Sequence, residues 1–148
     1  MDGMNETKLP QLRVSAAILY RDGKILICRR AEGGSCALLW EFPGGKQEPG
    51  ETPEQCVMRE CREELGVEIA PRGVFREFSY RYPEREIAFT FFTAEIARGE
   101  IRRIVHKELR WAAPRELTRF DFCPADKGIV EEIAEGEKKN AEEQTEKR

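Results

Sequence analysis

The amino-acid sequence predicts an α/β domain. The chain of 148 residues is long enough to bury one substantial core without a second domain. Apolar, β-branched runs indicate strands before and after residues 52–66, a segment that has the start and stop signals of a helix. We therefore expect one folded unit of strands and helices with polar ends.

The N-terminal part of the chain predicts a β-hairpin. Residues 1–11 are polar, and we expect them to form a flexible tail. Residues 12–20 are an apolar run that predicts the first strand. Asp22 and Gly23 are a turn signal, and residues 24–28 form the second strand after it.

A helix is predicted at residues 52–66. Thr52 is its expected N-cap, Pro53 its first residue and Gln55 the partner of Thr52 in a capping box. Gly66 is expected to end it. Apolar residues follow one stripe of this helix, and glutamates follow the adjoining stripe, so one side faces the core and the other is free for chemistry.

The second half of the chain returns to a strand pattern. Strands are expected at 74–82, 86–97 and 109–112, a helical turn at 114–117 and a final helix at 125–134.

Composition narrows the function classes. Charged residues make up 36% of the chain and the formal net charge is −3, which argues against a general nucleic-acid binder. No run approaches the roughly 18 apolar residues of a membrane span, and the N-terminus lacks an apolar signal region. The five cysteines form no C-x-x-C pair, which favours buried thiols over structural zinc and predicts a cytoplasmic location.

Three glutamates of the predicted helix form a candidate magnesium site. Glu60, Glu63 and Glu64 are spaced i, i+3 and i+4, so they project side by side and repel one another unless a cation lies among them. Mg²⁺ prefers oxygen ligands and is usually held by a few carboxylates together with substrate phosphates. Gly44 and Gly45 lie in a preceding loop that can approach a phosphate or metal closely. The pattern therefore indicates a polyphosphate substrate.

These residues also resemble the Nudix hydrolases, whose box reads G-x5-E-x7-R-E-U-x-E-E-x-G-U with U apolar. The fixed positions of the box are occupied by Gly45, Glu51, Arg59, Glu60, Glu63, Glu64 and Gly66, and the apolar positions by Cys61 and Val67. A match at all of these positions is very rare by chance. The alternative interpretation is a surface helix whose charged residues are merely solvated.

The resemblance implies roles for the matching residues. It implies metal ligands at Glu60, Glu63, Glu64 and the carbonyl of Gly44, a residue that orders water at Glu51, and a bracing cation at Arg59. The implied cofactor is Mg²⁺, with Mn²⁺ as a substitute. Because neighbouring carboxylates titrate together, the pattern names no single catalytic base.

The extent of the resemblance defines the expected domain. It covers roughly residues 12–135, and the fold it implies is a mixed β-sheet sandwiched between helices. Residues 136–148 mix both signs of charge without apolar anchors, so we expect a disordered tail or frayed helix there.

Segments 28–30 and 40–46 resemble the MutT branch of the family, which hydrolyses nucleoside triphosphates to the monophosphate and pyrophosphate. This likeness implies that Arg30 and Lys46 contact substrate phosphates; the alternative is two solvated surface cations. It also makes Phe42 a candidate substrate contact, with an ordinary core residue as the alternative.

Asp126 is the candidate for base recognition. MutT proteins acting on 8-oxo-dGTP often have Asn at this place, whereas a Pro-Ala-Asp version is similar to members acting on CTP, dCTP and 5-substituted cytosine nucleotides. An ionised Asp only accepts hydrogen bonds, which favours the amino group of cytosine, but a protonated Asp weakens this argument. The alternative is that Asp126 caps the last helix.

One position departs from the branch pattern. Members usually have Glu, as an extra metal ligand or base, six residues before a strand tryptophan, and here Val105 has this place before Trp111. Glu108 can replace it only if the loop changes register; otherwise the enzyme uses the helix ligands and Glu51 alone. His106, the only histidine, is expected to be a loop residue rather than a catalyst.

The leading prediction is a Mg²⁺-dependent nucleoside triphosphate pyrophosphohydrolase that sanitises the nucleotide pool, acting on 8-oxo-dGTP or on (d)CTP and its 5-substituted forms. One alternative is hydrolysis of ADP-ribose or another nucleoside diphosphate derivative. A second, motivated by Val105, is a nucleotide sensor without turnover. The expected partner is a small nucleotide, with no stable nucleic acid or membrane, and monomer and homodimer both remain open.

Overall fold

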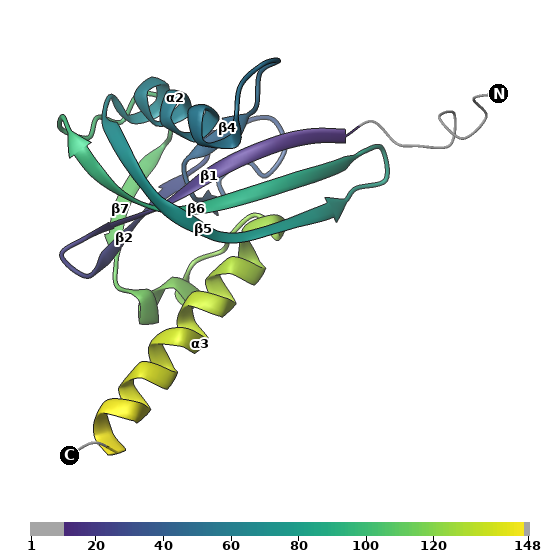
Figure 1. Cartoon of the computed structure of the whole chain (residues 1–148). Coiled ribbons are helices and arrows are strands. Elements are labelled where there is room, and N and C mark those ends of the chain that lie inside the picture. The colour runs from purple at the N-terminus through teal and green to yellow at the C-terminus, as the bar shows by residue number, and fades with distance from the viewer. Residues whose placement is uncertain (1–10, 147–148) are drawn as a thin grey trace.

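A computed structural model describes residues 11–146 (Figure 1). The expected N-terminal tail lies outside the described residues except for Gln11, which begins the first strand. The strands are β1 (Gln11–Arg21), β2 (Lys24–Arg29), β3 (Trp40–Glu41), β4 (Gly44–Lys46), β5 (Glu68–Arg81), β6 (Glu86–Arg98) and β7 (Glu108–Ala112). The helices are α2 (Pro53–Leu65), the 3₁₀ helix η1 (Pro114–Arg119) and α3 (Pro124–Glu146).

Strand β1 is the centre of the sheet. The strand order is β3-β2-β1-β6-β5, with β4 paired to β1 and β7 paired to β2. β1 runs parallel to β6, while the other strand pairs are antiparallel. The sheet is therefore mixed, as predicted.

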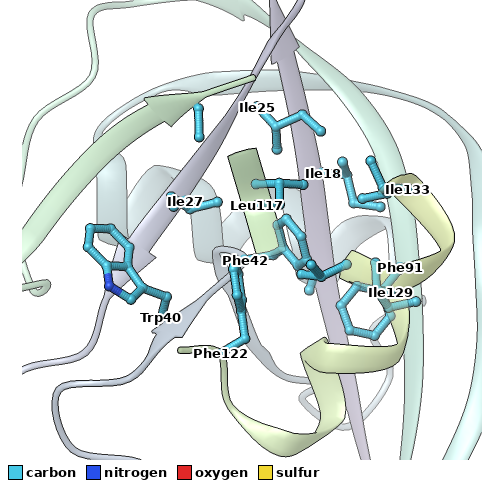
Figure 2. Packing of buried hydrophobic residues seen from close by; sticks show 13 residues of the cluster. Ile18, Ile25, Ile27, Trp40, Phe42, Phe91, Leu117, Phe122, Ile129 and Ile133 are labelled. Carbon is cyan, nitrogen blue, oxygen red and sulfur yellow. The ribbon is translucent and has the colours of Figure 1, made fainter. Parts of the chain in front are cut away.

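Alternation along β1 places a core on each face of the sheet. Ile18 belongs to a cluster with Ile129 and Ile133 of α3, which Figure 2 shows in close-up. Its neighbour Leu19 points the other way, into a cluster that contains Leu65 of α2. Figure 1 shows α2 and α3 on opposite sides of the strands. The prediction of a mixed sheet sandwiched between helices is thus confirmed.

The boundaries of α2 follow from local chemistry. The Thr52 side chain accepts a hydrogen bond from the backbone N–H of Gln55. The side chain of Gln55 in turn accepts one from the backbone N–H of Thr52, and Pro53 is the first residue of the helix. Gly66 ends it in the left-handed conformation, at φ 72°. The capping box and the stop signal are therefore present as predicted.

The structure differs from the expected boundaries in two places. β5 begins at Glu68 rather than at residue 74, because pairing with β6 continues through irregularities around Pro71 and Gly73. α3 continues to Glu146 through the segment expected to be disordered or frayed. That segment is rich in Glu and Lys, which favour helix without any apolar contact. None of the helices within residues 11–146 is long and apolar enough to span a membrane.

Candidate active site

Arg59 is the hub of the predicted site. Its Nε lies 2.7 Å from Oε2 of Glu51 and its Nη2 3.0 Å from Oε1. Nη1 contacts the carboxylates of Glu60 at 2.8 Å and Glu63 at 3.2 Å. Nη2 also donates to the backbone carbonyl of Lys46 at 2.9 Å. One guanidinium therefore connects α2 to strand β4 and to the turn at Glu51.

These contacts change the proton affinity of the partners. The Arg59 guanidinium, helped by the backbone N–H of Glu48, lowers the pKa of Glu51 to about 2. In return, Glu51 and then Glu60 raise the pKa of Arg59. Both side chains are therefore held in their charged forms at neutral pH.

Gly44 and Gly45 were expected in a loop but lie in the short strand β4, because they pair with β1, and close packing requires glycine at both positions. Gly44 pairs with Ala16 of β1, and a Cβ at Gly44 would overlap the backbone carbonyl oxygen of Ser15. A Cβ at Gly45 would overlap the carboxylate of Glu60 instead. Strand β4 thus lies directly against both β1 and the acidic stripe of α2.

The three box glutamates differ in their surroundings. The side chain of Glu63 is 57% exposed, whereas those of Glu60 and Glu64 are 15% and 14% exposed. Glu64 accepts a hydrogen bond from the Gly44 N–H at 3.3 Å. Burial, reinforced by the charges of Glu41 and Glu60, raises the pKa of Glu64 to about 9. A partly buried carboxylate with like charges beside it is a place where a cation binds favourably.

Glu41 is a site residue that sequence reasoning missed. It ends β3, and its Oε1 accepts a hydrogen bond from Arg30 Nη1 at 2.9 Å. Its Oε2 lies 3.0 Å from Nε2 of His106, which is 4.0 Å from Glu64. Glu41 was overlooked because it stands outside the box and its partner lies 65 residues away. His106 does lie in the loop before β7, as expected, but its side chain is buried.

Other predicted substrate contacts are spread around this region. Arg30 lines a cavity of 210 Å³ together with Glu41 and Glu64. Lys46 is exposed at the end of β4. The ring of Phe42 is 3% exposed and packs against Phe122 at 5.5 Å between centroids, which favours its core interpretation (Figure 2).

Asp126 lies in the first turn of α3, where it is 7% exposed. Its Oδ1 accepts a hydrogen bond from the backbone N–H of Phe42 at 3.3 Å, so it connects α3 to the loop after β3. Burial, together with the charge of Glu41, raises the pKa of Asp126 to about 8. A protonated Asp126 both donates and accepts, so this residue does not favour cytosine in the way that an ionised one would.

Val105 has the place where the branch pattern has an additional glutamate. Val105 is 52% exposed and lines the same cavity as Glu64. Glu108 lies in β7, where it pairs with Arg110 at 2.9 Å and with Arg29 at 3.8 Å. It is not among the residues that line the cavity beside Glu64. The β7 register therefore directs Glu108 to other partners.

The donor set fits a hard divalent cation by its chemistry. Glu60 and Glu64 offer carboxylate oxygens in a partly buried place, and among the described residues no Lys or Arg forms an ion pair with Glu64. No group of three metal-binding side chains already converges within residues 11–146. The reason is visible in the contacts, because Arg59 holds Glu60 and Glu63 itself. A cation would therefore need these carboxylates to turn from Arg59.

The comparisons with known proteins agree with this geometry. The NUDIX domain model matches residues 9–133, so the chain belongs to the Nudix family. It is 35% identical over 123 residues to the CTP pyrophosphohydrolase of Escherichia coli K12, an alignment that covers 83% of this chain and 91% of that protein. It is 33% identical over 126 residues to the 8-oxo-dGTP diphosphatase of the same organism, covering 84% and 98%.

Solved structures are similar along most of the chain. The solution structure of the E. coli ORF135 protein has a TM-score of 0.73 at 34% identity and covers 83% of this chain and 88% of that one. The MutT protein of methicillin-resistant Staphylococcus aureus 252 has a TM-score of 0.71 at 30% identity, covering 86% and 98%. The predicted class, a MutT-like Nudix hydrolase, is thus confirmed, and Nudix hydrolases generally use divalent metal ions.

Proposed function

We propose that this protein is a Mg²⁺-dependent hydrolase that converts nucleoside triphosphates to the monophosphate and pyrophosphate. The observation that carries the proposal is the gathering of Glu60 and Glu64 beside Gly44 and Gly45 of β4, with Arg59 bridging Glu60 to Glu51. Relatives with 33% and 35% identity are named for hydrolysis of nucleoside triphosphates, which supports this substrate class.

The box residues would hold the metal. We assign the ligands to Glu60, Glu63, Glu64 and the backbone carbonyl of Gly44. Bound Mg²⁺, for which Mn²⁺ can substitute, would neutralise phosphate charge and so favour attack of water on phosphorus. Arg30 and Lys46 would add positive charge on the phosphates.

Glu51 and Arg59 have different parts in this proposal. Glu51 remains ionised because Arg59 and a backbone N–H hold it, so it is an acceptor that orders water at the site. Arg59 touches carboxylates and a backbone carbonyl, which suits a positioning residue. Its fixed charge keeps the acidic cluster together in the absence of metal.

The proposed substrates are 8-oxo-dGTP and the cytosine nucleotides, namely CTP, dCTP and their 5-substituted forms. One relative described above is named for 8-oxo-dGTP and another for CTP. The raised pKa of Asp126 removes the main sequence argument for cytosine, since the protonated carboxyl offers a donor as well as an acceptor. We therefore propose a role for Asp126 in base recognition without a preference between the two classes.

The test is a product analysis. The protein would be incubated with Mg²⁺ and with dCTP, 5-methyl-dCTP, CTP, 8-oxo-dGTP, dGTP or ADP-ribose, and the products separated by chromatography. We expect monophosphate and pyrophosphate from at least one triphosphate, with Glu63→Gln strongly impaired. AMP from ADP-ribose alone would instead identify a nucleoside diphosphate derivative as substrate.

A sensor without turnover is the second candidate, and Val105 at the place of the auxiliary acid favours it. Tight nucleotide binding with no product in either Mg²⁺ or Mn²⁺ would support the sensor. Rapid pyrophosphate release would contradict it.

We also propose a cytoplasmic location. Cys28, Cys56, Cys61 and Cys123 are buried free thiols, and Cys36 is partly exposed. Burial raises the pKa of the Cys56 thiol to about 11, so it is little ionised at neutral pH. Free thiols of this kind are usual in reducing compartments.

A further inference from the structure

A cavity of 210 Å³ lies beside the box helix α2. Its lining includes Glu64, Arg30, Glu41 and His106. Arg30 directly follows β2, Glu41 ends β3 and His106 lies in the loop before β7. Three separate segments thus bring charged or polar groups to one opening next to the acidic stripe.

His106, Glu41 and Arg30 form a continuous chain of hydrogen bonds. His106 Nε2 lies 3.0 Å from one oxygen of Glu41, and Arg30 Nη1 lies 2.9 Å from the other. With its proton on Nε2, the imidazole donates to Glu41, which then accepts from both sides. Glu41 is 17% exposed and Arg30 37% exposed, so the chain runs from the interior outward to the cavity.

His106 is held firmly in the interior. Its side chain is 3% exposed. Arg103 Nη1 donates to its backbone carbonyl at 2.9 Å, and the N–H of Lys107 donates to the carbonyl of Arg29 at 2.9 Å. These bonds fix the loop on both sides of the ring, which gives Nε2 a defined position against Glu41.

The second ring nitrogen makes the burial costly. Among residues 11–146, no group hydrogen-bonds Nδ1 of His106, although this atom is buried. An unpaired buried polar atom destabilises a fold, and an apolar side chain at this place would avoid that cost. The ring therefore contributes through the contacts of Nε2, which bonds Glu41 at 3.0 Å and lies 4.0 Å from Glu64, rather than by filling space.

We propose that His106 is a positioning residue that orients Arg30 through Glu41. The Nε–H of Arg30 is held separately by the backbone carbonyl of Ser35, at 3.1 Å. Without His106, Glu41 keeps only its bond to Nη1 of Arg30, so its carboxylate and that end of the guanidinium can turn away from the cavity. With His106, the guanidinium is directed to the opening beside Glu64, where the proposed function places the substrate phosphates. The inference rests on that proposed function for the identity of the ligand, but the hydrogen-bonded chain is a property of the protein alone.

Binding of magnesium pyrophosphate tests this relay, the hydrogen-bonded chain from His106 through Glu41 to Arg30, without depending on the nucleotide base. The variants are His106→Ala, His106→Gln, Arg30→Ala and the double variant with both alanines, measured by calorimetry. We expect His106→Ala to weaken binding about tenfold, as for a lost charge-assisted hydrogen bond. Because the Gln amide can donate to Glu41, His106→Gln should recover most of this loss. In the Arg30→Ala background, removal of His106 should change the affinity by less than about twofold.

The double variant separates positioning from a general loss of structure. If the two single effects multiply in the double variant, His106 does not act through Arg30 and the proposal is wrong. Kinetic assays on an active triphosphate should show the effect of His106→Ala mainly in KM, since the relay concerns phosphate binding. Ile104→Ala is the control, because Ile104 is an exposed residue of the same loop that does not line the cavity.

A measurement without any ligand keeps the relay testable if the proposed function fails. The Nη1–H of Arg30, which donates to Glu41, should give a distinct, ordered ¹H–¹⁵N signal in the wild type, assigned by its loss in Arg30→Lys. We expect His106→Ala, but not Ile104→Ala, to broaden or remove it. An unchanged signal in His106→Ala would overturn the proposal. Absence of pyrophosphate binding by the wild type with a His106-dependent signal would instead reject only the proposed function.

Discussion

Arg59 holds both carboxylate oxygens of Glu51 through two separate nitrogens, at 2.7 and 3.0 Å. This two-point contact joins the turn before α2 to the middle of the helix. Because the same guanidinium reaches Glu60 and Glu63, the orientation of the acidic stripe depends on Glu51 as well.

The first prediction concerns the shape of this cation. Arg59→Lys keeps the charge but cannot form two parallel bonds to Glu51 while it reaches Glu60. We expect kcat/KM to fall roughly tenfold or more, since hydrogen bonds to charged groups carry this much free energy. Steady-state assays would measure the loss. Arg62→Lys, at an exposed pair with Glu68, is the matched control and should change little.

The second prediction concerns stability in acid. The pKa of Glu51 in the folded protein is about 2, below its ordinary value of 4.5. The contribution of Glu51 to stability is therefore fully present above pH 4.5. It is lost as the pH falls from 4.5 towards 2. Denaturation at a series of acidic pH values should show a shallower loss of stability in Glu51→Gln than in the wild type over this window. Parallel curves would contradict the proposed pairing with Arg59.

The third prediction compares substitutions of Gly44 and Gly45. A Cβ at Gly44 meets the backbone of Ser15, which cannot move freely, so Gly44→Ala should destabilise the protein by roughly 2–3 kcal/mol. A Cβ at Gly45 meets only the end of the Glu60 side chain, which can turn aside. Gly45→Ala should therefore retain most of its stability but lose activity. Denaturant unfolding and turnover assays would test this contrast, and equal destabilisation of both variants would oppose it.

The fourth prediction concerns Asp126. Its folded pKa is about 8, above its ordinary value of 3.8, so its contribution to stability is fully present below pH 3.8 and is lost as the pH rises through 8. Asp126→Asn keeps an acceptor for the Phe42 N–H without a buried charge. We expect thermal unfolding of the variant to be less sensitive to pH between 5 and 9 than that of the wild type. An equal sensitivity would show that other groups dominate.

The fifth prediction concerns metal binding without turnover. If Mg²⁺ binds the folded protein through Glu64, it should raise the unfolding temperature, with a stabilisation of about 2.7 kcal/mol at a hundredfold excess over Kd. Glu64→Gln should lose most of this Mg²⁺ effect. Glu131→Gln, on the exposed side of α3, should retain it. Removal of metal with a chelator should return the wild type to its metal-free unfolding temperature.

Much of the site could be predicted because its signals are local. The helix positions of Glu60, Glu63 and Glu64 follow from spacing, and the start of the helix follows from Thr52 and its partner Gln55. Apolar, β-branched runs likewise predicted most strands. Their ends were less predictable, since pairing with β6 extends β5 back to Glu68.

The remaining features needed the tertiary structure. The sequence by itself determined the helix, its caps, the acidic stripe and the class of enzyme, because each depends on residues a few positions apart. The fold alone brings His106 to Glu41 and Asp126 to Phe42, across separations of 65 and 84 residues. It also decides which carboxyls are buried and so have raised pKa values, as at Glu64 and Asp126. Burial and long-range contact arise only when the sheet and both helices pack together.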